Sequence, residues 1–412
     1  MSNATDQHTT AGVQAPKRGS AGEVFLVFLR LGLTSFGGPI AHLGYYRSEL
    51  VLRRKWLDEQ AYGDLVALCQ FLPGPASSQV AFALGVFRGG GLAGGLAAWL
   101  AFTLPSALIL VAFAFGAAAF RGLIADGVFY GLKLVAVCVV AQAIWGMART
   151  LTPDKERAAI ALLAIAVVVG FGGSFGQIAS IVLGTLAGLW LCRDEGTSVP
   201  GHLSFPVSAR SGAVSLALFT ALLIFPSLVE RATGSHAVGL FDAFYRSGAL
   251  VFGGGHVVLP LLQTAVVNTG WVKSEAFLQG YGLAQAMPGP LFTFAAYLGS
   301  VASPVPNGLA GAAIALVAIF LPGTLLVCGM LPFWDALRSR PGAQAAMRGA
   351  NAAVVGILGM ALYDPVWKSA VVTPGDFALA VTGFLLLVVW RMPSWVVVVF
   401  LAAAGALRAS VM

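Results

Sequence analysis

Charged side chains are scarce in this sequence. Asp, Glu, Lys and Arg make up 10% of the 412 residues, whereas soluble domains carry about a quarter. So few charges cannot cover a soluble fold of this length, which excludes a soluble enzyme or binding module. The hydrophobic residues, 58% of the chain, can instead face a lipid bilayer, where about 20 apolar residues form one spanning helix. The chain has room for about twelve or thirteen such helices.

Cysteine is equally rare, and its placement excludes two kinds of site. The four cysteines lie far apart, without a C-x-x-C pair or a neighbouring histidine, so neither a disulfide framework nor a metal site is indicated. We interpret them as thiols that pack between helices. The sequence also lacks a G-x-x-x-x-G-K-[ST] motif, so ATP is not expected to drive its activity. No cofactor is predicted. The cysteines are Cys69, Cys138, Cys192 and Cys328.

Carboxylates are nearly absent from the interior of the apolar segments. The six aspartates in or beside these segments all lie close to segment ends, which leaves few candidates for a proton relay. Asp64 is the weak choice if protons are coupled. We interpret His256 as a local hydrogen-bonding residue. The six aspartates are Asp64, Asp126, Asp242, Asp335, Asp364 and Asp376.

The net charge of +7 has two ordinary explanations in a membrane protein. Basic loops accumulate on the cytoplasmic side, and a positive surface attracts an anionic substrate. The basic residues are spread along the chain, so nucleic-acid binding is not indicated. Residues 1–20 are polar and carry Lys17 and Arg18 without a hydrophobic stretch. We expect them to form a disordered cytoplasmic tail rather than a cleaved signal peptide.

Apolar runs divide the chain into six segments, one segment and six segments. The predicted organisation is a first repeat over 21–192, a linker with one central membrane segment over 193–235, and a second repeat over 236–412. Because spanning segments with long apolar runs are expected to be helices, the predicted fold is an all-α polytopic membrane protein. The runs lie near 22–45, 61–87, 90–119, 127–149, 157–173, 174–192, 211–229, 240–266, 276–300, 306–334, 344–364, 376–391 and 393–411.

The two sets of six segments are copies of each other. The residues Phe28, Arg30, Gly32, Phe36, Gly37 and Gly38 recur 216 positions later as Phe244, Arg246, Gly248, Phe252, Gly253 and Gly254. Gln70 and Pro73-Gly74-Pro75 recur 215 positions later as Gln285 and Pro288-Gly289-Pro290. An odd central segment between two even sets makes the second copy enter the membrane in the opposite sense. The sequence therefore predicts inverted repeats, a plan used by many secondary transporters.

The distribution of basic residues supports a cytoplasmic N-terminus. The main exception is a basic stretch, Arg47, Arg53, Arg54 and Lys55, which would lie outside if the first segment crossed the membrane completely. Either the first boundary is misplaced or this segment is a re-entrant hairpin. The basic residues expected at the cytoplasmic side are Arg88, Arg149, Lys155, Arg157, Arg193, Arg210, Lys273, Arg338, Arg340 and Arg391.

Proline and glycine interrupt two segments at matching positions. A Pro-Gly-Pro in the middle of a segment breaks the hydrogen-bond ladder, and such breaks are tolerated only against protein or a water-filled cavity. The resulting half-helices offer free N–H groups and a positive dipole end to an anion. A kink used only in packing is the alternative. Phe36-Gly37-Gly38-Pro39 and its copy Phe252-Gly253-Gly254-Gly255 are interpreted as a second built backbone feature. The predicted broken-helix residues are Pro73, Gly74, Pro75, Pro288, Gly289 and Pro290, with Gly37, Gly38, Gly253 and Gly254.

Polar side chains inside the apolar runs complete the candidate anion site. Arg30 and Arg246 carry a planar fork of donors suited to an oxyanion, although snorkelling to the interface is the alternative. Lys133 is the other basic residue well inside a run of the first half, and its counterpart is the neutral Asn351. Gln70 and Gln285 can donate amide hydrogens to a bound oxygen, or to a neighbouring helix.

These paired motifs resemble the chromate ion transporter family. The resemblance rests on Phe28-Leu29-Arg30-Leu31-Gly32, Phe36-Gly37-Gly38-Pro39 and Gln70-Phe71-Leu72-Pro73-Gly74-Pro75 with their copies, and covers about residues 22–390. It matches the long-chain, two-domain form of that family. It implies a multi-pass protein of the bacterial inner membrane that exports chromate and confers resistance, with sulfate as the look-alike anion. A homodimer is one assembly compatible with this interpretation.

Several alternatives stay open at this point. Gly255 stands opposite Pro39 and Asn351 opposite Lys133, so we expect the first half to dominate anion binding. A sulfate or other oxyanion permease cannot be separated from a chromate exporter by sequence. A membrane-bound chromate reductase would need a redox cofactor, a reactive cysteine pair or metal ligands, and a passive channel would show flux without saturation.

Overall fold

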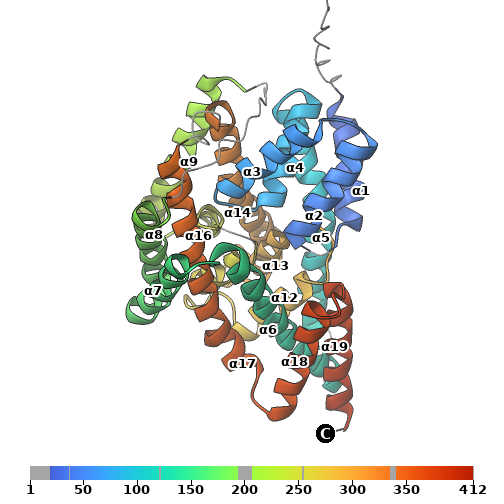
Figure 1. Ribbon diagram of the computed structural model, residues 1–412. Coiled ribbons are helices and arrows are strands. Elements are labelled where there is room, and N and C mark those ends of the chain that lie inside the picture. The colour runs from blue at the N-terminus through green and yellow to red at the C-terminus, as the bar shows by residue number, and fades with distance from the viewer. Residues whose placement is uncertain are drawn as a thin grey trace, which may run out of the picture.

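The computed structural model describes residues 19–36, 38–119, 122–193, 207–252, 255–334 and 340–411. Within these ranges the chain consists of helices and connections, without a strand. Figure 1 shows α1, α3 and α4 at one end of the molecule and α17, α18 and α19 at the other. The predicted all-α fold is confirmed. Most of the predicted N-terminal tail, and the predicted site residues Gly37, Gly253 and Gly254, lie outside the described residues.

The helices of the two halves follow the duplication. The first half contains α1 (Ala21–Thr34), α2 (Gly38–Tyr46), η1 (Arg47–Arg53), α3 (Glu59–Phe71), α4 (Ala76–Gly89), α5 (Leu92–Ala119), α6 (Leu123–Leu151), α7 (Lys155–Phe171) and α8 (Gly173–Leu191). After α9 (Ala209–Thr233), the second half contains α10 (His236–Ala249), η2 (Gly255–Val257), α11 (Val258–Leu262), η3 (Gln263–Val267), α12 (Ser274–Ala284), η4 (Leu291–Thr293), α13 (Phe294–Val301), α14 (Gly308–Met330), η5 (Leu331–Phe333), α16 (Pro341–Ala361), η6 (Leu362–Trp367), α17 (Lys368–Ala370), α18 (Pro374–Val388) and α19 (Ser394–Val411).

Five of the described helices are long and apolar enough to cross a bilayer. The other apolar segments are shorter helices, and the predicted segments at 61–87 and 276–300 are each two helices separated at the Pro-Gly-Pro. Fourteen residues, the length of α1 and of α4, span only about 21 Å, which is less than the hydrocarbon core of about 30 Å. The five long helices run over Leu92–Gly116, Ile124–Leu151, Ala209–Thr233, Gly308–Phe333 and Pro341–Ala370.

The helices at the start of the first half enter the molecule and return to the same end. Gly32 of α1 contacts Phe102, the eleventh residue of the 28-residue α5, so α1 stops about halfway along that helix. Arg88 at the end of α4 forms an ion pair with Glu23 at the start of α1, with N–O distance 3.0 Å. The same guanidinium lies 5.3 Å from the centre of the Trp56 ring, which precedes α3. The α1–η1 and α3–α4 segments are therefore two re-entrant hairpins.

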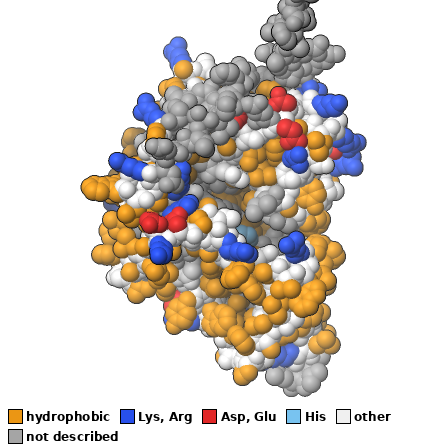
Figure 2. Space-filling view, viewed as in Figure 1, with side chains coloured by type: hydrophobic (Ala, Val, Ile, Leu, Met, Phe, Trp, Pro, Cys, Tyr) orange, Lys and Arg blue, Asp and Glu red, His pale blue; other side chains and the backbone are white. Residues whose placement is uncertain are grey.

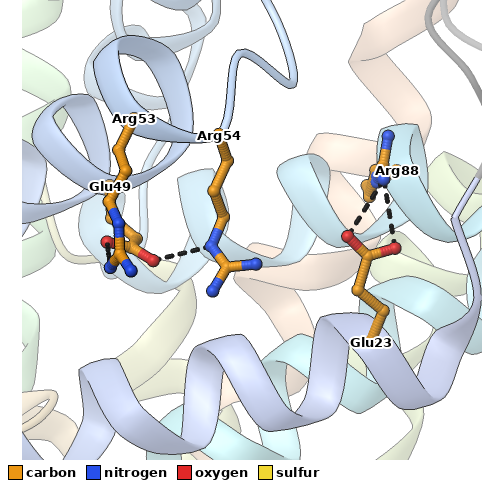
Figure 3. Close-up of polar contacts among 5 residues, drawn as sticks. All are labelled: Glu23, Glu49, Arg53, Arg54 and Arg88. Atoms are coloured by element: carbon orange, nitrogen blue, oxygen red, sulfur yellow. Dashed lines mark hydrogen bonds and ion pairs between the residues drawn. The ribbon is translucent and has the colours of Figure 1, made fainter.

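Figure 3 shows that this shared end, here called the first end, is rich in ion pairs. Glu49 accepts hydrogen bonds from Arg53 and Arg54 at 2.8 and 2.6 Å, beside the Arg88–Glu23 pair. Arg47 binds Glu59 at the start of α3 with a distance of 2.8 Å. The re-entrant hairpin proposed from the charge distribution is confirmed. The basic stretch lies at the same end as Arg88, because the chain has turned back before reaching it.

The second half repeats this arrangement at the opposite end of the molecule. The rings of His236, which begins α10, and Trp271, which precedes α12, lie 4.5 Å apart. The N–H of Ser303, just after α13, donates to the carbonyl of Trp271 at 3.0 Å. We call this the second end. Phe115, near the end of α5, lies against Gly308, the first residue of α14, so α5 begins at the first end and finishes at the second. The halves are inverted.

α9 connects the two ends between the halves. Its start at Gly212 packs on Pro332, which follows α14, and its Glu230 contacts Gly239 near the start of α10. The chain therefore leaves the first end and arrives at the second before the second repeat begins. This single crossing explains why two similar sequences form hairpins that enter from opposite sides.

Candidate functional site

The tips of the four re-entrant hairpins meet in the interior through two backbone hydrogen bonds. The N–H of Gly74 donates to the carbonyl of Val251 at 2.7 Å, and the N–H of Gly289 donates to the carbonyl of Ser35 at 2.9 Å. Val251 lies 216 positions after Ser35, and Gly289 lies 215 positions after Gly74. The two bonds are thus equivalent under the duplication, and each joins a Pro-Gly-Pro of one half to the first hairpin of the other.

Glycine is required at both Pro-Gly-Pro tips for two reasons. Gly74 and Gly289 have φ angles of 123° and 92°, which disfavour any residue with a Cβ. A Cβ on Gly289 would also lie 3.2 Å from the carbonyl oxygen of Phe102, and one on Gly74 would lie 3.1 Å from the Cα of Gly323. The predicted broken helices are confirmed, and their tips approach long helices of the opposite half at backbone distance.

A cavity of about 240 Å³ opens at this crossing. Most of its wall comes from the second half, from the α12 tip and from the connection between α18 and α19. Figure 2 shows basic side chains gathered across the middle of one face, around a histidine. The lining residues are Gly38, Val139, Gln142, His256, Ala284, Gln285, Met287, Gly289, Leu291, Leu387, Arg391, Met392, Pro393 and Ser394.

The polar groups of the cavity are hydrogen-bond donors or can become donors. Among the described residues that line the cavity, Arg391 is the one cation and none is a carboxylate. The Nε2 of Gln285 is buried and has no hydrogen-bond partner among the described residues. Nδ1 of His256 lies 2.9 Å from the hydroxyl oxygen of Tyr281. Ser394, the first residue of α19, brings the positive end of an 18-residue helix to the wall. This set suits an oxyanion.

Arg391 is held in a left-handed backbone conformation. Its φ of 52° costs a residue with a Cβ on the order of 1–2 kcal/mol. The connection that contains it runs from Val389 to Pro393, whereas Gly172 alone joins the corresponding helices α7 and α8. Ser394 fixes the end of this connection, because its hydroxyl donates to the carbonyl of Gln285 at 2.8 Å.

The structure brings part of the predicted site together. Gly38, Gln285 and Gly289 line the cavity, and Pro288 and Pro290 are buried beside them. The first-half tip formed by Pro73, Gly74 and Pro75 does not line it. That tip packs on Gly323 of α14, where Gln79 donates to the carbonyls of Pro73 and Gly323 at 2.9 and 3.2 Å. The Gln70 side chain is exposed.

The predicted basic residues lie outside the cavity wall. Arg246 is held by Asp242 at 2.8 Å, and also donates to the hydroxyl of Ser227 and the carbonyl of Leu223 on α9, both at 2.6 Å. Lys133 lies 3.4 Å from Glu275 of α12. Arg30 is exposed on the outward face of α1, and none of the described acidic residues forms an ion pair with it.

Leu26 shows why the two matching arginines differ. It occupies the position that corresponds to Asp242 and is 68% exposed on the outward face of α1. Arg30 therefore has no carboxylate one helical turn before it, whereas Arg246 does.

Two of the basic residues expected on one side of the membrane do not lie with Arg88. Lys273 precedes α12 at the second end, and Arg391 lines the cavity at the connection between α18 and α19. We expected the first half to dominate anion binding, but most residues that line the cavity belong to the second half. The connection between the last two segments is longer in the second half than in the first. This difference in length could have pointed to Arg391.

Comparison with known proteins agrees with the duplicated architecture. The sequence profile described as chromate transporter matches residues 22–189 and again residues 238–406. The chain belongs to the chromate transporter family. Each match coincides with one inverted half, and the unmatched residues between them include the whole of α9. The family is one of transporters rather than enzymes, and with five long apolar helices this member is a multi-pass membrane protein.

Curated relatives resemble the chain over most of its length. A chromate transport protein of Pseudomonas aeruginosa is 29% identical, covering 98% of this chain and 94% of the relative. One of Cupriavidus metallidurans is also 29% identical, covering 89% and 87%. A probable chromate transport protein of Synechococcus elongatus is 30% identical, covering 82% and 84%. No solved structure matches the chain.

Proposed function

We propose that this protein is a secondary transporter that exports chromate across the bacterial inner membrane and thereby gives chromate resistance. The observation that carries the proposal is the cavity at the crossing of inverted, broken hairpins, because transporters of this plan bind substrate near the bilayer midplane between their repeats. A wall with one cation and no carboxylate favours an anion as substrate. The relatives named chromate transport proteins support chromate as that anion.

The charge of the substrate favours export. A dianion that leaves a cell with a negative interior gains about 2.3 kcal/mol per charge for each 100 mV, or about 4.6 kcal/mol in total. The membrane potential is therefore a sufficient driving force. The basic stretch Arg47–Lys55 and Arg88 at the first end support a cytoplasmic location of that end. The N-terminus, which precedes α1, is proposed to be cytoplasmic too.

The first test is uptake of radiolabelled chromate into everted membrane vesicles from cells with and without this protein. We expect saturable uptake that depends on the membrane potential, survives collapse of the pH gradient and is inhibited by sulfate. Uptake of sulfate into right-side-out vesicles, with no chromate uptake into energised everted ones, would identify a sulfate permease instead. Flux that rises without saturation would identify a channel, and chromium recovered in a reduced form would identify a reductase.

Arg30 stays a candidate for the substrate path, although it does not line the cavity. An arginine in an apolar segment costs roughly 3 kcal/mol on insertion scales, and no described carboxylate compensates this one. We expect Arg30→Ala to abolish chromate transport while the protein still reaches the membrane. Unimpaired chromate resistance in cells that carry this variant would remove Arg30 from the path. A homodimer also stays a prediction.

A further inference from the structure

We infer that the substrate anion has a single binding station, built by the second half, in which Arg391 and Gln285 are the specificity-determining side chains. The inference rests on the proposed function and adds where the anion sits. The first half contributes Gly38 to the wall, together with Val139 and Gln142 from α6. Neither Pro73-Gly74-Pro75 nor Gln70 reaches this cavity, so the duplicated motifs do not form two equal stations.

Arg391 is exposed at the cavity and, unlike three half-buried arginines, has no ion-pair partner among the described residues. Arg88, Arg246 and Arg408 are paired with Glu23, Asp242 and Asp376, respectively. Arg391 forms no ion pair with a described residue and lines a cavity whose described wall contains no carboxylate. An unpaired guanidinium at such a wall is free to bind an anion, and a tetrahedral oxyanion fits its planar fork of donors.

Gln285 supplies a second, independent indication of a missing ligand. Its Nε2 is buried without a hydrogen-bond partner among the described residues, although unpaired buried donors are rare and costly. Its backbone carbonyl accepts from the Ser394 hydroxyl, which ties the α12 tip to the connection that carries Arg391. The amide donor and the guanidinium are therefore presented to one cavity from two anchored segments. An oxyanion would satisfy both.

The local backbone explains why only the second half has this station. The connection between α18 and α19 has five residues, Val389 to Pro393, and places Arg391 at the tip with a φ of 52°. In the first half, Gly172 alone joins α7 to α8, and Gln177 near the start of α8 is already engaged with the carbonyl of Pro260 and the hydroxyl of Thr264. The first half has no connection long enough to deliver an equivalent arginine.

The test compares four variants of the full chain in everted vesicles. We expect Arg391→Gln to raise the KM for chromate at least tenfold and Arg391→Lys to raise it less, because lysine keeps the charge without the fork. Gln285→Leu should raise KM more than Gln70→Leu, the same change at the duplicate position. Arg231→Gln, at an exposed site at the end of α9, controls for loss of a positive charge.

A binding readout separates this inference from the proposed function. Chromate should raise the Tm of the purified wild-type protein and of Arg231→Gln, but not that of Arg391→Gln, whose Tm without anion should match the wild type. If the wild type transports chromate and Arg391→Gln does so with the same KM, or if Gln70→Leu and Gln285→Leu act equally, the single station is overturned. If the wild type itself neither binds nor transports chromate, the proposed function fails instead. Should Arg391→Gln not fold, Arg391→Lys decides by the same two measurements.

Discussion

Gly289→Ala should reduce chromate transport more than tenfold, whereas Gly270→Ala should leave it close to wild type. Both glycines have a positive φ, 92° and 78°, so both substitutions carry a similar backbone cost of on the order of 1–2 kcal/mol. They differ in surroundings. A methyl group on Gly289 would lie 3.1 Å from the Ser106 hydroxyl and 3.2 Å from the Phe102 carbonyl, whereas Gly270 has open space.

The extra effect at Gly289 comes from the crossing of the hairpins. To relieve the contact with Phe102, the tip must move away from α5, and this movement weakens the hydrogen bond from Gly289 to Ser35. It also displaces the neighbouring Gln285 from the cavity. Initial rates in everted vesicles, normalised to the amount of protein in the membrane, measure the difference between the two variants. Equal rates for them would show that the tip tolerates displacement.

Arg408→Met should destabilise the protein by about 3–5 kcal/mol, the usual cost of leaving a buried charge unpaired. Its partner Asp376 has no exposed surface and also accepts hydrogen bonds from the N–H groups of Val372 and Thr373 at 3.0 and 2.8 Å. Arg408 further donates to the hydroxyl of Tyr130 at 2.9 Å. Removing the guanidinium leaves the carboxylate buried between α6, α18 and α19.

Lys368→Met provides the matched control. Lys368 and Asp364 form an ion pair of 2.7 Å, but both side chains are about half exposed, at 51% and 47%. Such surface pairs contribute about 0–1 kcal/mol. The Tm of each purified variant in detergent is the measurement, and the double variant Asp376→Asn/Arg408→Met should recover part of the loss. A Tm for Arg408→Met equal to that for Lys368→Met would mean that water reaches Asp376.

Local chemistry made much of the fold predictable. The break at each Pro-Gly-Pro follows from the missing proline N–H and the freedom of glycine, and both breaks were predicted from the residues themselves. The basic stretch Arg47–Lys55 left two explanations, a misplaced boundary or a re-entrant first hairpin, since four charges on the wrong side of the membrane contradict a complete crossing. The inverted sense of the halves followed from the odd central segment.

The candidate site was less predictable because it depends on tertiary contacts. Arg391 follows an apolar run, and charges at that position normally mark a loop at the membrane surface. Its place at the cavity is set by α18 and α19, which are too short to cross the membrane and turn back at the hairpin tips. The ion pair of Arg246 could have been predicted from the sequence, since Asp242 precedes it by one helical turn and such pairs interact. Whether a glutamine meets a cavity or an exposed surface, as for Gln285 and Gln70, is not encoded locally.

The reciprocal hydrogen bonds between the hairpin tips can form only because α9 crosses the membrane once between the two halves. Gly74 can reach Val251, and Gly289 can reach Ser35, only when the two copies face each other across the membrane. Removing this one helix would give both copies the same topology, so their tips would point in the same direction and each carbonyl would lose its donor. A stretch of chain that matches neither copy and touches no substrate residue thus determines whether two similar sequences can become one protein.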